Sequence, residues 1–260
     1  MQDSLVFIYV FIFLLGSIVG SFLNVCIYRL PRQINFWSGR SYCPKCKKKI
    51  IWYDNIPLIS YWLLNKKCRT CKKIIPFQYF LIELLTAFGF LLIFTQYQLF
   101  LDQILLAILF SIFIIIFFID LKHFIIPDSL NFLLIIIGIF KNFLEPLNIP
   151  LNQNMQDTLI GGLLGYMMIW LIIYAYKKIK NIEGMGLGDA KLLAAFGFLF
   201  GYSALPIILF LAACLGLIFA LPALIRKTKS LKSELPFGPF LILATLLYAF
   251  YFENLIIFIL

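Results

Sequence analysis

Charged residues are scarce in this sequence of 260 residues: they make up 13% of the chain, whereas hydrophobic residues make up 63%. This scarcity excludes a soluble single domain, because a globular core of this size cannot bury so much apolar surface. Apolar runs of about 18 residues or more, each long enough to cross a bilayer, recur along the chain. The short alternating segments of a transmembrane barrel are absent. The composition therefore predicts an all-α polytopic membrane protein.

Three other features are missing from the sequence. The N-terminus carries Asp3 and lacks the basic region and small-residue cleavage site of a signal peptide, so we expect the first apolar run to remain as a membrane span. No glycine-rich nucleotide-binding fingerprint follows a predicted strand. Histidine occurs only once, as His123, and we predict a loop position for it.

We expect about eight transmembrane helices. The boundary between the sixth and the seventh depends on Gly201 and Pro206, which interrupt one long apolar run. The predicted spans cover residues 4–28, 80–99, 103–120, 129–147, 157–176, 190–204, 205–224 and 239–259. The predicted domains are a first span (1–28), a small cytosolic domain (29–79) and a helical domain of about seven spans (80–260).

Positive charge is concentrated on one side of the predicted membrane. The formal net charge is +10, and twelve of the 22 Lys and Arg residues lie between residues 29 and 73. Most of the others follow predicted spans three, five and seven, so the positive-inside rule places these loops in the cytosol and both termini outside. We interpret the basic loops as topology signals that attract anionic lipid, and not as a nucleic-acid-binding surface.

Two acidic residues stand at predicted membrane edges. Asp120 ends the third span and Asp189 opens the sixth. Two crossings lie between them, so both are expected at the cytosolic edge, where two adjacent carboxylates can share one proton and act as base and acid, as in aspartic peptidases. Gly186 and Gly188 leave room for backbone or substrate beside Asp189. The alternative for Asp189 is a structural one, because an acid stabilises the start of a helix.

Other residues have simpler interpretations. Asp128 follows Pro127 and is predicted to begin a helix. Glu83, just inside the second span, needs a polar partner, and its role, functional or structural, stays open. Gly161 and Gly165 are four residues apart in the fifth span, which predicts close helix packing.

Four cysteines form the pattern C-x2-C-x21-C-x2-C in the first basic loop. Its central gap is one residue longer than the usual zinc spacing. The loop is predicted to be cytosolic, so disulfides are disfavoured. Four thiolates suit a structural Zn²⁺ and leave no open position for catalysis. A unit of this size cannot build much core, so the metal would hold its fold. The predicted ligands are Cys43, Cys46, Cys68 and Cys71.

Taken together, these features resemble the prepilin peptidase family, the type IV prepilin leader peptidases and N-methyltransferases, which are GxGD-type intramembrane aspartic peptidases. The resemblance covers nearly the whole chain. It is carried by the segments GSFLNVCIYRLP (20–31), CPKC (43–46), YDNIPLISYW (53–62), CRTC (68–71), QYFLIELLTA (78–87), IDLKHFIIPD (119–128), GMGLGDAKLLAAFG (184–197) and PFGPFL (236–241).

The resemblance implies that Asp120 and Asp189 are the catalytic pair and that the four-cysteine loop is a zinc-binding domain. The implied substrates are type IV prepilins and the pseudopilins of type II secretion. Their basic leader would be cut after a glycine at the cytosolic face of the bacterial inner membrane. The resemblance further implies methylation of the new N-terminus with S-adenosylmethionine; a peptidase without methyl transfer is the alternative.

Two other classes of function remain as alternatives. A transporter that couples to protons or cations would need acids near the middle of the membrane, and the spans carry none there beyond the edge pair. A zinc-organised membrane scaffold without catalysis would tolerate Asn at both Asp120 and Asp189.

Overall fold

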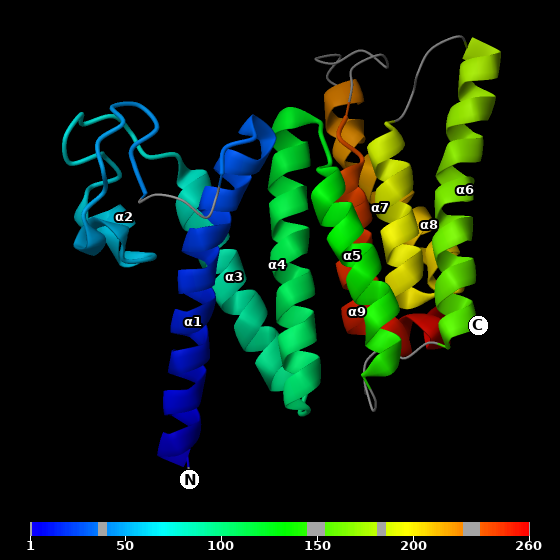
Figure 1. Cartoon of the computed structure of the whole chain (residues 1–260), viewed down its shortest axis with the longest axis horizontal. Helices are drawn as coiled ribbons and strands as arrows, with labels where there is room; N and C mark the ends of the chain where they lie inside the picture. The colour runs from blue at the N-terminus through cyan, green and yellow to red at the C-terminus, as the bar shows by residue number, and fades with distance from the viewer. Residues whose placement is uncertain (1, 36–40, 145–153, 181–185, 226–234, 260) are drawn as a thin grey trace. The chain divides into compact units, whose positions relative to one another are not determined.

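The structure is a computed structural model that describes residues 2–35, 41–144, 154–180, 186–225 and 235–259 (Figure 1). Within these ranges the chain is helical and contains no β-strand, which confirms the predicted all-α class. The α-helices are α1 (Gln2–Arg29), α2 (Ile59–Leu63), α3 (Phe77–Gln96), α4 (Phe100–His123), α5 (Asp128–Phe140), α6 (Met155–Lys180), α7 (Leu187–Phe200), α8 (Ala204–Ile225) and α9 (Gly238–Ile259).

Five helical segments in the described ranges are long and apolar enough to cross a membrane. They are Leu5–Arg32, Phe77–Gln96, Phe100–His123, Met155–Ile179 and Ala204–Leu221. These segments identify a membrane protein, whereas the total of eight spans stays a prediction.

Two of the remaining predicted spans correspond to shorter helices. α5 has 13 residues and α7 has 14, so each is only about 20 Å long, less than the hydrocarbon thickness. α5 ends at Phe140 and a 3-10 turn follows it, whereas the predicted span continued to residue 147. Residues 145–147 of that prediction lie outside the described residues. The last predicted span corresponds to α9, in which residues Gly238–Tyr251 form an apolar helical segment.

The chain divides into two compact units, residues 1–115 (unit 1) and 116–260 (unit 2), and α4 contributes to both. In unit 1, α1 packs closely along α3. A Cβ atom at Gly16 would lie 2.8 Å from the Cα atom of Ala87, and one at Gly20 would lie 2.7 Å from that of Glu83. Small residues thus let the two backbones approach, as is common between membrane helices.

In unit 2, α7 packs between α5 and α6. Ten of its 14 residues are buried. A Cβ atom at Gly161 of α6 would lie 2.5 Å from the carbonyl oxygen of Gly197, and one at Gly165 would lie 2.6 Å from that of Leu193. These contacts confirm the predicted packing role of Gly161 and Gly165. They hold α7 against α6 at the centre of the unit.

Four helix ends meet at one end of unit 2, namely the C-terminal end of α4 and the N-terminal ends of α5, α7 and α9 (Figure 1). α4 is ended by Phe124, whose φ of 55° lies in the left-handed region. Pro127 then precedes the first residue of α5. Side chains from distant parts of the sequence therefore converge at this end of the unit.

Because α6 and α7 are in contact at glycines, we predict that one added methyl group there lowers the stability of the protein. Gly161→Ala should lower the free energy of unfolding by roughly 1–3 kcal/mol, because the new Cβ would overlap the Gly197 carbonyl. Thermal unfolding of the purified protein in detergent would measure this. Gly216→Ala in α8 is the matched control, since its Cβ would meet the nearest atom at 3.6 Å. Equal stability of both variants and the wild type would contradict the packing account.

Candidate functional site

Asp120 lies in the last turn of α4 and is buried, with 5% of its surface exposed. Its backbone carbonyl accepts a hydrogen bond of 2.9 Å from the N–H of Phe124. The backbone N–H of Gly238 faces the carboxyl group. The Oδ2 atom is buried and has no hydrogen-bond partner within the described part of the chain. A buried, unpartnered carboxyl oxygen is costly, so this atom is suited to a water molecule, a proton or a substrate group.

Asp189 lies in the first turn of α7 and is also buried, with 8% of its surface exposed. Its backbone N–H donates to the carbonyl of Gly186 at 3.2 Å, which closes the first turn. The N-terminal end of a helix favours a negative charge. Burial therefore disfavours the ionised form of the Asp189 carboxyl group, whereas its position at the helix start favours that form.

The two acids face one cavity of about 230 Å³ in unit 2. The carboxyl groups interact electrostatically. The cavity is lined by Asp120, Phe124, Ile125, Ile126, Asp128, Gly186, Gly188, Asp189 and Lys191. The structure therefore brings together the acids and glycines that the sequence singled out. Their catalytic role stays a prediction at this point.

The two glycines before Asp189 differ in their surroundings. A Cβ atom at Gly188 would lie 3.3 Å from the Cβ atom of Ile126, so the α4–α5 connection passes close to this position. A Cβ atom at Gly186 would lie 3.8 Å from Oδ2 of Asp189, which is ordinary contact. Gly188 therefore permits close packing, whereas Gly186 leaves open space beside the carboxyl group.

Gly238 is a site residue that the sequence reasoning missed. A Cβ atom at this first residue of α9 would lie 2.6 Å from Oδ2 of Asp120 and 3.1 Å from the side chain of Ile126. The available signal was a glycine between Pro236 and Pro239 at the start of an apolar run. That pattern indicates a tight helix start, but it does not indicate which side chain the glycine approaches.

An ion pair lies at the rim of the same cavity. Lys191 Nζ is 2.7 Å from Oδ1 of Asp128, and both side chains are exposed. Asp128 is the first residue of α5, which confirms its predicted position at a helix start. The pair links the starts of α5 and α7 next to the buried acids.

In unit 1, the four predicted metal ligands come together. The sulfur atoms of the two Cys-x-x-Cys motifs all lie within 4.8 Å of one another. Tetrahedral zinc with Zn–S bonds of about 2.3 Å separates its sulfurs by about 3.8 Å, and the sulfurs of Cys43 and Cys71 are 3.9 Å apart. The cluster is therefore suited to a metal ion. Its members are Cys43, Cys46, Cys68 and Cys71.

The two cysteine motifs have the same local structure. The N–H of Cys43 donates to the carbonyl of Lys48 at 2.9 Å, and the N–H of Lys47 donates back to Cys43 at 2.8 Å. Cys68 makes the same two bonds with Lys73 and Lys72, both at 2.9 Å. In each motif the residue after the second cysteine has a φ of 58°. Each motif therefore forms a tight knuckle.

The two thiols of the second knuckle differ in pKa, with that of Cys68 lowered and that of Cys71 raised. A backbone hydrogen bond from Cys71 lowers the pKa of Cys68 to about 7, which favours the thiolate that binds metal. Arg69 makes a two-point contact with Asp54, at 2.8 and 2.6 Å. The hydrogen bonds that Arg69 donates to Asp54 also raise the pKa of Arg69. The contact ties the segment between the knuckles to the cysteine cluster.

Glu83 has the polar partner that its position required. Its Oε2 atom accepts a hydrogen bond of 2.8 Å from the N–H of Leu58. Leu58 has a φ of 62°, which is unusual for a residue with a side chain. Glu83 therefore has at least a structural role, holding the segment between the knuckles against α3.

Comparisons with known proteins agree on one family. The model described as bacterial peptidase A24 N-terminal domain matches residues 14–97, and the model described as type IV leader peptidase family matches residues 107–221. No solved structure matches the chain significantly.

Three relatives are each named prepilin leader peptidase/N-methyltransferase. The protein of Aeromonas salmonicida (strain A449) is 34% identical over 258 residues, covering 90% of this chain and 87% of its own. That of Neisseria gonorrhoeae is 36% identical, covering 86% and 84%. That of Vibrio cholerae serotype O1 is 34% identical, covering 92% and 95%. At this identity and coverage, the chain belongs to the type IV leader peptidase family.

Proposed function

We propose that this protein is a membrane endopeptidase that removes the leader of type IV prepilins and pseudopilins and then methylates the new N-terminal amine. The names of the relatives support both activities. The observation that carries the peptidase assignment is the burial of Asp120 and Asp189, from α4 and α7, around one cavity. Neither acid belongs to an ion pair among the described residues, so both are available for chemistry.

Two carboxyl groups in one buried cavity disfavour double ionisation, so the pair retains one proton. The ionised group takes a proton from a water molecule, whose oxygen attacks the scissile carbonyl carbon. The protonated group donates to the carbonyl oxygen. The tetrahedral intermediate then collapses, the C–N bond breaks, and the departing amine takes up a proton. The roles of Asp120 and Asp189 in the first step are interchangeable in this scheme.

The position of the pair suits the proposed substrate. By the positive-inside rule, the loops that carry the Lys and Arg residues lie in the cytosol, and the cavity lies at the α4 and α7 ends on that side. A basic leader stays in the cytosol of a bacterial cell, and its junction with a hydrophobic helix lies at the inner-membrane edge. A glycine before the scissile bond would fit beside Gly186, which leaves open space next to the Asp189 carboxyl group.

The four-cysteine loop within residues 29–79 would bind one structural zinc ion. Four sulfur ligands at this spacing support zinc as the metal. Four sulfur ligands leave no open coordination position, so the ion would hold the two knuckles together and take no part in peptide cleavage. The proposed cleavage uses residues of unit 2 alone.

Removing either carboxyl charge should stop leader cleavage. Asp120→Asn and Asp189→Asn should each lower the rate by at least about 100-fold, because neither amide can act as the base and proton donor. A prepilin peptide assay in detergent would measure the rate. Asp157→Asn, at the start of α6 and outside the cavity, should keep wild-type activity. Retained cleavage in either site variant would exclude the proposed pair.

Adding one methyl group at Gly238 should also impair cleavage. In Gly238→Ala, the Cβ would lie 2.6 Å from Oδ2 of Asp120, so the carboxyl group must move. A displacement of about 1 Å can lower a rate by about 100-fold. Gly216→Ala again serves as the control, and the same peptide assay applies. Full activity of Gly238→Ala would mean that the α9 start does not position Asp120.

Zinc removal should disorder the cysteine loop without unfolding unit 2. Elemental analysis should find one zinc ion per wild-type chain and a large loss in Cys68→Ser, whereas Cys214→Ser should retain the metal. After chelation, limited proteolysis should cut within residues 41–75, because so small a unit depends on its metal. A protease-resistant loop after complete zinc removal would contradict this role.

A further inference from the structure

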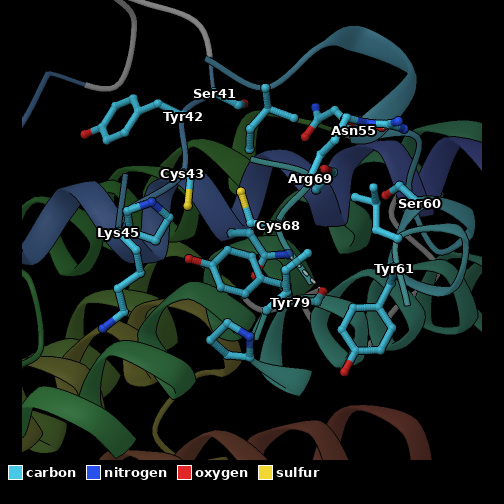
Figure 2. A pocket seen from close by; sticks show the side chains of 18 of the residues that line it. Ser41, Tyr42, Cys43, Lys45, Asn55, Ser60, Tyr61, Cys68, Arg69 and Tyr79 are labelled. Carbon is cyan, nitrogen blue, oxygen red and sulfur yellow. Dashed lines mark hydrogen bonds and ion pairs between the residues drawn. The ribbon is translucent and has the colours of Figure 1, made fainter. Parts of the chain in front are cut away.

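A cavity of about 260 Å³ lies beside the cysteine cluster in unit 1, and the proposed cleavage does not use it (Figure 2). Its walls come from α1, from the segment between the knuckles and from the start of α3. In Figure 2, Tyr79 lies below the sulfur atoms of Cys43 and Cys68. Tyr61 lies on the side of Tyr79 that faces away from these sulfurs. Residues far apart in the sequence thus enclose a single space.

The walls of this cavity are rich in aromatic rings. Tyr28, Tyr42, Tyr61, Tyr79 and Phe80 all line it. The rings of Tyr61 and Phe80 stack with centroids 5.3 Å apart and planes 28° apart. Such walls bind a flat heterocycle by stacking, and their faces attract cations.

Cations already occupy aromatic faces at this site. The guanidinium carbon of Arg29 lies 5.6 Å from the ring centroid of Tyr42. Arg69 also lines the cavity, and its guanidinium carbon lies 5.4 Å from the ring of the neighbouring Tyr53. Cation–aromatic contacts therefore already occur in and beside this cavity.

Charges of both signs line the same cavity. Glu83 contributes a half-buried carboxylate whose Oε2 atom accepts one backbone N–H. A carboxylate has about four acceptor positions, so Glu83 retains capacity for a further donor. The positive lining residues are Arg29, Lys45, Lys48, Lys49, Arg69 and Lys73. These positive groups can attract a ligand carboxylate.

Resting on the methyl transfer in the proposed function, we propose that this cavity binds the methyl donor, S-adenosylmethionine. The ligand combines a flat heterocycle, two cationic groups and one carboxylate, and the cavity offers aromatic walls, the Glu83 carboxylate and a basic rim. Tyr61, Tyr79 and Phe80 would hold the heterocycle, and Glu83 would hold a cationic group. Leader cleavage and donor binding thus use residues of different units.

The proposed methyl transfer would be a single displacement at the methyl carbon of the donor. The amine nitrogen of the cleaved substrate forms a bond to the methyl carbon as the carbon–sulfur bond breaks, and that electron pair stays on sulfur. The donor becomes a neutral thioether, and the methylated amine releases one proton to water. Glu83 would position the donor, and the tyrosines would exclude bulk water from it.

Binding measurements on the zinc-loaded full chain in detergent test the assignment. Glu83→Gln keeps an acceptor for the Leu58 N–H but removes the charge, and it should weaken S-adenosylmethionine binding about tenfold. Tyr79→Ala should weaken binding by a similar factor through loss of the ring. Both variants should keep their zinc and their leader cleavage. Tyr202→Ala, an exposed tyrosine in unit 2, is the control and should bind as the wild type does.

Photocross-linking of radiolabelled S-adenosylmethionine, followed by peptide mapping, locates the site directly. We expect labelled peptides within residues 21–83. Labels confined to residues 116–260, or unchanged affinity in both Glu83→Gln and Tyr79→Ala, would overturn the inference while leaving the proposed function intact. A protein that cleaves leaders but neither binds the donor nor methylates its product would overturn the inference together with the methyl-transfer half of the proposed function.

Discussion

Two carboxyl groups held in one buried cavity constrain the rest of unit 2. Their burial is tolerable only where backbone groups and helix ends are arranged around them. α7 carries Asp189 into the unit and is itself almost fully buried, which requires the glycine contacts with α6. The start of α9 approaches Asp120 so closely that a side chain at position 238 would displace its carboxyl group. Packing and proposed chemistry therefore depend on the same few backbone contacts.

The cysteine loop of unit 1 is stabilised in a different way. This extramembrane loop is too small to be stabilised by an apolar core, and two knuckles with the same hydrogen-bond pattern present four sulfurs to one point. The contacts of Asp54 with Arg69 and of Glu83 with Leu58 fix the segment between the knuckles. This arrangement leaves an aromatic, charged cavity between the loop and its two helices. The loop therefore forms a wall of this cavity and also carries the cysteine cluster.

The sequence predicted those features that depend on local spacing or on counting spans. The cysteine pattern is local, and the two predicted crossings between Asp120 and Asp189 led us to expect both acids at one edge; the structure places both in one cavity. Helix packing at Gly161 and Gly165 also follows from spacing alone. Gly238 was missed because its meaning depends on a tertiary approach to Asp120, 118 residues earlier in the sequence. The cavity beside Tyr79 was missed for the same reason, since three separate segments form its walls.

The central claim is that Asp120 and Asp189 act together on one peptide bond. The most direct measurement is an experimental structure, in a lipid bilayer, of the Asp120→Asn protein with a bound prepilin. The account predicts that the scissile carbonyl lies between the side chains of residues 120 and 189, with the basic leader on the side of the Lys-rich loops. A substrate bound elsewhere, with the two side chains remaining apart, would contradict it.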